Sequence, residues 1–146
     1  MKEVFVRFVL YGLTGWCVEL VYTAIIDSYH KKDWNLTGKT YLWMFFVYGS
    51  AVFLFEPVHE LILNFPIILR FIIWSLGITG IEFISGFLIK KVSGSCPWDY
   101  SYSRFAINEY IRWDYFPIWA VFGLILEKLH VFYVRLSPVL VELIFT

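Results

Sequence analysis

The sequence is poor in charge and in cysteine. Only 16% of its 146 residues are charged, and 12 acidic residues balance 12 basic ones, so the formal net charge is zero. A neutral chain offers no electrostatic basis for binding nucleic acid, and no nucleic-acid partner is predicted. The two cysteines are Cys17, inside an apolar run, and Cys96, in a loop. They predict no disulfide and indicate no redox compartment.

Apolar and aromatic residues take the place of charge. Hydrophobic residues make up 60% of the chain and the mean hydropathy is +0.68, whereas soluble domains contain roughly 45–50% apolar residues. Aromatic residues reach 22%, and Trp and Tyr favour the boundary between lipid and water. The composition predicts a multi-pass integral membrane protein, with the cell membrane as its expected location and the lipid bilayer as its surroundings.

Four apolar segments are long enough to cross a bilayer, which takes about 20 residues of helix. The first is long and carries Glu19, so it is predicted to be a spanning helix and not a cleavable signal peptide. A last apolar piece, 138–145, is too short to span and is predicted to lie at the interface or against the bundle. The predicted spans are residues 4–26, 41–63, 67–89 and 115–134.

The connections between the spans are unequal. Residues 27–40 and 90–114 form long loops, whereas 64–66 is a tight turn. Both long loops therefore lie on one side of the membrane, and their excess of Lys and Arg predicts that this side is cytoplasmic. Residues 1–146 are thus predicted to form a single all-α domain, a four-helix transmembrane bundle with up-down-up-down topology.

The sequence also contains a faint internal repeat. The stretch 14–19, which ends in Glu19, resembles 79–82, which ends in Glu82. The motif Glu-x-x-His occurs once in the second span and once in the fourth. Two helix pairs in the same orientation would be related by a pseudo-two-fold axis along the membrane normal.

Each predicted span carries a glutamate at depth. A charge near the centre of a bilayer costs about 2.5–3.5 kcal/mol, so each carboxylate requires compensation. Protonation with hydrogen bonds between helices, pairing with cations along an ion path, or a bound metal would each provide it. The four residues are Glu19, Glu56, Glu82 and Glu127.

Two histidines favour the metal interpretation. His59 and His130 each follow a buried glutamate by three residues, which places both side chains on one face of a helix. Two single glutamates plus two Glu-x-x-His motifs form the ligand set of ferritin-like di-iron and di-manganese bundles. The predicted ligands are Glu19, Glu56, His59, Glu82, Glu127 and His130. Two divalent ions would cancel their four negative charges.

The carboxylate-rich set predicts iron or manganese in preference to zinc. Redox chemistry on a lipophilic small molecule would make the protein a membrane di-metal oxidoreductase. Counting helical rise from the large-loop side places Glu56 about 22 Å deep, whereas Glu19 and Glu82 are about 10–12 Å deep. The site therefore closes only if the second helix starts later or tilts. Glu60 is a further ligand or an interface residue, and Pro57 is either a kink or a tolerated membrane proline.

Two other functions remain open. The same glutamates would line an ion or solute path in a permease-like or transporter-accessory protein. Alternatively, protonated glutamates would only join the helices of a structural bundle by hydrogen bonds. A homo-oligomer or a transporter subunit is the expected protein partner in either case.

The loop between the third and fourth spans is aromatic. It contains the run from Cys96 to Ser101, Cys-Pro-Trp-Asp-Tyr-Ser. Turn-forming Pro and Asp with interfacial Trp and Tyr explain this composition as a membrane anchor. The functional alternative is a lid over the bundle whose side chains contact a substrate or a lipid headgroup. The candidate contact residues are Trp98, Asp99, Tyr100 and Arg104.

The sequence combines the motif from Trp98 to Ser101 with Gly15-x-x-x-Glu19, Tyr48-Gly49 and Glu82-Phe83-x-x-Gly86. With these motifs it resembles the putative ABC-transporter type IV family, also called CmpB-like. The resemblance covers nearly the whole chain. It implies a small multi-pass membrane protein and, by the family's name, a permease. The sequence itself contains no Gly-rich phosphate loop that would bind a nucleotide.

Overall fold

The computed structural model describes residues 1–32 and 34–145, and within them the fold is all-α. The only strand-like pairing described is an isolated bridge between Ala106 and Arg112. Four helical stretches are long and apolar enough to cross a membrane: Lys2–His30, Leu42–Ile62, Ile67–Ser93 and Trp113–Phe145. The elements are α1 (Lys2–Lys31), α2 (Leu42–Gly49), α3 (Ala51–Ile62), α4 (Ile67–Ser93), the 3₁₀ turn η1 (Trp113–Tyr115) and α5 (Phe116–Phe145).

The predicted all-α fold and its four helices long and apolar enough to span a membrane are confirmed, with one correction at the C-terminus. Residues 138–145 are not a separate interfacial piece, because α5 runs without interruption through Pro138 to Phe145. Proline at this position removes the backbone hydrogen bond to the carbonyl of Val134. The Ser137 hydroxyl donates to that carbonyl at 3.4 Å. A neighbouring side chain thus replaces part of the lost bond, and the helix continues.

The second span is two helices joined at Ser50. Helix α2 ends at Gly49 and α3 begins at Ala51. The Ser50 hydroxyl between them donates to the Val47 carbonyl at 2.6 Å. Gly-Ser pairs are frequent sites of helix kinks. Pro57 lies seven residues later, inside α3, which is assigned as continuous helix from Ala51 to Ile62. The break in this span therefore lies at Gly49-Ser50 and not at the proline.

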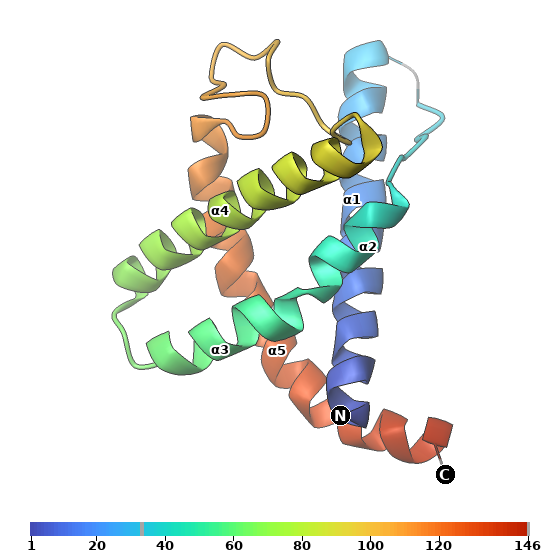
Figure 1. Ribbon diagram of the computed structural model, residues 1–146, viewed down its shortest axis with the longest axis vertical. Coiled ribbons are helices and arrows are strands. Elements are labelled where there is room, and N and C mark those ends of the chain that lie inside the picture. The colour runs from blue at the N-terminus through green and yellow to red at the C-terminus, as the bar shows by residue number, and fades with distance from the viewer. Residues whose placement is uncertain (33, 146) are drawn as a thin grey trace. The chain divides into compact units, whose positions relative to one another are not determined.

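The chain divides into two compact units. Unit 1 contains Met1–Val58 and the chain from Phe132 onward, and unit 2 contains His59–Val131. Within unit 1, α1 and α2 lie side by side (Figure 1). Gly12 permits this contact, because a Cβ there would lie 2.7 Å from the Phe45 ring and 3.0 Å from the Phe45 carbonyl oxygen.

Unit 2 is built from the end of α3, from α4, and from the first part of α5 with the loop before it. Gly123 of α5 lies directly against the Trp74 side chain of α4. The loop packs onto α4 at Gly86, where Tyr110 and Trp98 are the nearest neighbours. The Trp98 indole N–H donates to the Tyr110 carbonyl at 3.0 Å and holds the two ends of the loop together.

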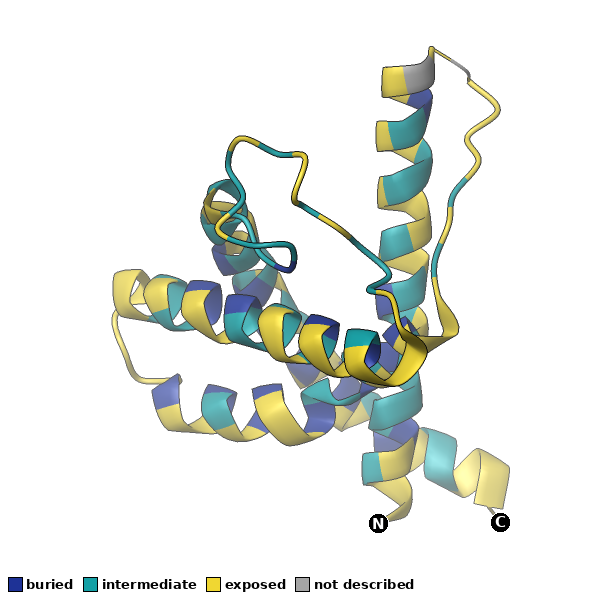
Figure 2. Ribbon diagram, turned by 45° about the horizontal axis from the view of Figure 1, so that its top comes forward, coloured by how far each residue is buried: buried dark blue, intermediate teal, exposed yellow. Residues whose placement is uncertain are grey.

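Burial follows the pattern of a membrane protein. Large apolar side chains are exposed along the helices, and all exposed residues are coloured yellow in Figure 2. Ile68 and Leu61, for example, are 73% and 76% exposed. By contrast, Glu127 and His130 are only 4% and 5% exposed. Polar groups inside and apolar groups outside are the arrangement that lipid requires.

Candidate metal centre

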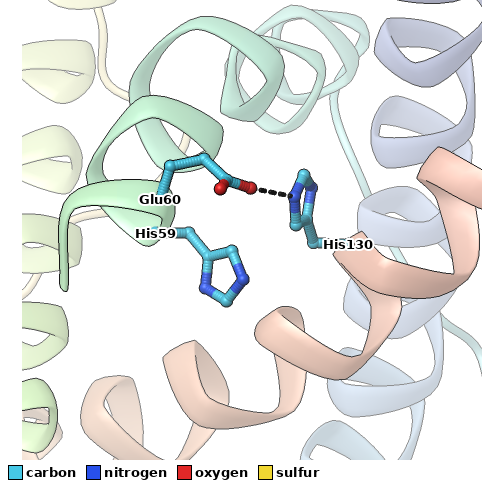
Figure 3. Close-up of side chains that lie close together, drawn as sticks. All are labelled: His59, Glu60 and His130. Atoms are coloured by element: carbon cyan, nitrogen blue, oxygen red, sulfur yellow. Dashed lines mark hydrogen bonds and ion pairs between the residues drawn. The ribbon is translucent and has the colours of Figure 1, made fainter. Parts of the chain in front are cut away.

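Two histidines and one glutamate lie together in unit 2. His59 and Glu60 come from α3 and His130 comes from α5 (Figure 3). The Glu60 Oε1 atom is 3.3 Å from His130 Nε2, and the two imidazole ring centroids are 4.8 Å apart. One ligand atom from each residue lies within 4.8 Å of the other two. This spacing is compatible with all three side chains binding one ion after small rotations.

The cluster is polar at its centre and open on one side. His59 and His130 are 3% and 5% exposed, whereas the Glu60 side chain is 68% exposed. Glu60 is two residues from the end of α3 at Ile62, close to the turn that joins α3 to α4. The buried imidazoles are thus fixed by the fold, while the carboxylate connects the cluster to its surroundings.

Glu127 lies beside this cluster. Its Oε1 is 3.9 Å from His59 Nδ1. Arg70 forms an ion pair with both carboxylate oxygens, with Nε at 3.0 Å from Oε1. The buried Trp74 indole N–H donates to the same oxygen at 2.7 Å. Arg70 therefore neutralises Glu127 and, with Trp74, holds the carboxylate next to the His59 ring.

Glu56 has an equivalent cationic partner within unit 1. Arg7 of α1 donates to its two oxygens at 2.8 and 3.1 Å. The same guanidinium donates to the Ser137 hydroxyl at 3.3 Å. A bidentate arginine matches the geometry of a carboxylate and removes the charge that made Glu56 costly in lipid.

Glu19 and Glu82 are bound by neutral donors. Glu19 Oε2 accepts hydrogen bonds from Tyr48 at 2.9 Å and from Thr40 at 3.0 Å. Glu82 accepts one from Tyr100 at 2.9 Å and one from Trp119 at 3.0 Å. These contacts lie near the long loops and join neighbouring elements within each unit.

The structure therefore brings together only part of the predicted ligand set. In α1, Glu19 is 12 residues from the arginine that binds Glu56, which is about 18 Å of helix. Glu82 and Arg70, the partner of Glu127, have the same separation in α4. Each unit thus holds its two glutamates at different levels. His59 and His130, with Glu127 beside them, are the predicted ligands that the structure places near one another.

Sequence reasoning did not identify the two arginines as partners of the buried glutamates. The sequence did contain a signal for this pairing, which is the position of each arginine. Each lies within the first turns of a spanning helix, so it belongs to the bundle although it is near the boundary.

The candidate contact residues of the aromatic loop have contacts within unit 2. Asp99 Oδ1 accepts from the Ser101 backbone N–H at 2.9 Å, and hydrogen bonds from Ser101 lower the pKa of Asp99. The Arg104 guanidinium lies over the neighbouring Phe105 ring. Lys90 donates to Glu109, and that bond lowers the pKa of Glu109. A role for Trp98, Asp99, Tyr100 and Arg104 in substrate contact stays a prediction.

The hydrogen bond from Tyr100 to Glu82 is expected to stabilise the loop. We expect Tyr100→Phe to lower the free energy of unfolding by about 1–2 kcal/mol, because it removes one donor from a partly buried carboxylate. Tyr102→Phe is the matched control, since Tyr102 is 82% exposed. Detergent unfolding followed by circular dichroism measures both variants. Equal stability of the two variants would contradict the assignment.

Comparison with known proteins gives one family match. A family model described as "Putative ABC-transporter type IV" matches residues 6–144, which is nearly the whole chain. No solved structure matches the chain significantly.

Proposed function

The chain belongs to the family described as "Putative ABC-transporter type IV", and within this membrane framework we propose that it binds a divalent transition-metal ion through His59, Glu60 and His130. The observation that carries the proposal is the convergence of three ligand atoms within 4.8 Å, two of them from buried imidazoles. Two buried imidazoles and one carboxylate that converge in this way supply donor atoms that a single divalent ion can share.

The donor set narrows the class of metal. Two histidines and one carboxylate with open positions are typical of non-haem iron(II) sites, and the same donors also bind catalytic zinc. One divalent ion and one carboxylate would leave a single positive charge. Glu60 lies two residues from the end of α3, and a charge costs less near the end of a spanning helix than at its centre.

Glu127 would support the site without binding the ion. Metal-bound histidines commonly donate their second ring N–H to a carboxylate, which fixes the ring orientation. Glu127 lies 3.9 Å from His59 Nδ1 and is itself fixed by Arg70 and Trp74. A modest rotation of the imidazole would form this bond and direct Nε2 toward the metal.

A two-ion site stays a prediction from the sequence. It would add Glu19, Glu56, Glu82 and Glu127 as ligands and would hold iron or manganese for redox chemistry. Glu56 and Glu127 would first have to leave their arginine partners. We therefore propose the single-ion site as the form that the observed contacts support best.

The expected result of elemental analysis is about one transition-metal ion per chain after purification without chelator. The double variant His59→Ala, His130→Ala is expected to lose this ion, because both buried donors are removed. His30→Ala is the matched control, since His30 is exposed and lies outside the cluster. A metal-free parent protein, or a double variant that keeps its metal, would refute the single-ion site. Two ions per chain would instead support the larger ligand set.

Family membership supports a second candidate, a component of a transporter that works with a protein partner. In that case Glu19 and Glu82 would contact an ion or solute on its path, since the hydrogen bonds described above join both carboxylates to neutral donors. Uptake measured in vesicles would then fall in a Glu82→Gln variant that still folds. Unchanged uptake would remove Glu82 from the path.

A further inference from the structure

Each half of the chain contains the same set of contacts. Arg7 and Arg70 are 63 positions apart, as are Glu19 and Glu82. Their partners Glu56 and Glu127 are 71 positions apart. The bond from arginine Nε to glutamate Oε1 measures 2.8 Å in one case and 3.0 Å in the other. The two ion pairs are thus equivalent in position and in the atoms that they join.

The two glutamates nearer the long loops, Glu19 and Glu82, show the same equivalence. Tyr48 donates to Glu19 Oε2 at 2.9 Å, and Trp119, 71 positions after Tyr48, donates to Glu82 Oε2 at 3.0 Å. Independent contacts at constant offsets are not explained by the requirements of membrane burial alone. They indicate two copies of one two-helix motif, the second with a longer loop.

The same offset makes the two histidines equivalent. His59 and His130 are 71 positions apart, and their rings meet at 4.8 Å. The equivalence stops at the next residue. Glu60 follows the first histidine and reaches the ring of the second, but the corresponding residue after His130 is Val131. The first copy therefore supplies a carboxylate to the cluster, whereas the second copy has an apolar side chain at the equivalent position.

We infer that the metal centre is a duplicated site in which only one of the two copies supplies a carboxylate. Its open coordination position lies on the Val131 side. That position accepts an oxygen donor of a lipophilic molecule. This inference rests on the proposed metal site and adds its substrate class. Three protein ligands leave at least one position of a tetrahedral site free. Val131, on that side, is an apolar side chain that is 42% exposed. In a membrane, such an exposed apolar side chain contacts lipid, so a ligand approaching past it is apolar.

Restoring the missing carboxylate tests the equivalence. In Val131→Glu the new side chain is expected to bind the ion from the side opposite Glu60 and to cancel the remaining positive charge. We expect cobalt(II) to bind roughly tenfold tighter or more, a factor that corresponds to about 1.4 kcal/mol. X-ray absorption is expected to show one additional oxygen ligand. Ile125→Glu is the matched control, because Ile125 lies on the same helix and is 52% exposed.

Occupancy of the open position is tested on the cobalt-loaded protein with two hydroxamates. Octanohydroxamate is expected to change the visible spectrum at lower concentration than acetohydroxamate, because its chain lies in the apolar approach. Val131→Glu is expected to abolish both changes, whereas Ile125→Glu keeps them.

The outcomes distinguish failure of this inference from failure of the proposed metal site on which it rests. If the parent protein binds cobalt but Val131→Glu binds it no tighter and still takes up hydroxamate, the inference is overturned and the metal site remains. Equal gains in Val131→Glu and Ile125→Glu would also overturn the inference, because charge alone would explain them. If neither the parent nor Val131→Glu binds cobalt, both fail. Stronger binding by Val131→Glu than by both the parent and Ile125→Glu supports the duplicated arrangement.

Discussion

Arg70→Met is expected to lower the free energy of unfolding by about 3–5 kcal/mol, the typical cost of removing one partner from a buried ion pair. Arg70 binds both oxygens of Glu127, whose side chain is only 4% exposed. Without the guanidinium, a carboxylate would be left in a low-dielectric interior, where the Trp74 indole N–H still donates to it. Reversible unfolding in mixed detergent, followed by circular dichroism, measures the loss.

The double variant Arg70→Met, Glu127→Met distinguishes lost charge balance from lost packing. Two apolar side chains of similar volume remove the unpaired charge, and replacing a buried pair in this way is often neutral or stabilising. The double variant is therefore expected to recover most of the stability of the parent. A single variant within 1 kcal/mol of the parent, an effect of ordinary size, would show that the Arg70–Glu127 pair is not a buried stabilising contact.

The double variant also bears on the metal centre. Since Glu127 lies 3.9 Å from His59 Nδ1, its removal would free the imidazole to rotate. Loss of a supporting carboxylate typically costs a metal site 10–100-fold in affinity. Recovered stability with weakened metal binding would thus separate the structural role of the ion pair from its role beside the histidine.

The spanning helices could be predicted because lipid imposes a simple rule. A segment of about 20 apolar residues satisfies its own backbone only as a helix. Three predicted spans lie within the helical stretches found, and the fourth, 41–63, exceeds Leu42–Ile62 by one residue at each end. Hydropathy does not encode local bending. The break at Ser50 and the continuity of α5 through Pro138 depend on single side-chain hydrogen bonds, from Ser50 to Val47 and from Ser137 to Val134.

The buried glutamates and histidines could be found for the same reason, since polar residues are conspicuous in apolar runs. Their partners could not be assigned, because partner choice depends on the level at which each side chain enters the bundle. The depth count indicated that Glu56 and Glu19 enter at different levels. The structure resolves that conflict within unit 1 by giving Glu56 an arginine near the start of α1 and Glu19 two hydroxyl donors farther along.

The spacing of the Glu-x-x-His motif favoured both of its residues as metal ligands, but the structure gives the two residues different partners. In each copy the glutamate is held by the arginine of the preceding spanning helix, while the histidine reaches the shared cluster. The motif thus joins an anchoring residue to a candidate ligand on one helix face. Spacing alone does not separate these roles, because residues at i and i+3 share a face whether or not they share a ligand.

Gly123→Val is expected to destabilise the protein by about 3 kcal/mol, at the upper end of the usual cost of overpacking. A Cβ on Gly123 would overlap the Cβ and Cγ atoms of Trp74. Trp74 is 3% exposed and donates to Glu127, so it has little space into which to move. Helices α4 and α5 would have to separate, and the indole hydrogen bond beside His59 would weaken.

Gly77→Val in α4 is the matched control for this prediction. No neighbour lies within 4 Å of a Cβ built there, so the same substitution adds a side chain to open space on a helix surface. Its unfolding free energy is expected to stay within about 0.5 kcal/mol of the parent, as for surface substitutions in general. If Gly123→Val and Gly77→Val unfold alike in the same detergent titration, the close approach of α4 and α5 at Trp74 is wrong. In that case the support that Trp74 and Glu127 give to His59 would have to be abandoned as well, because it depends on that approach.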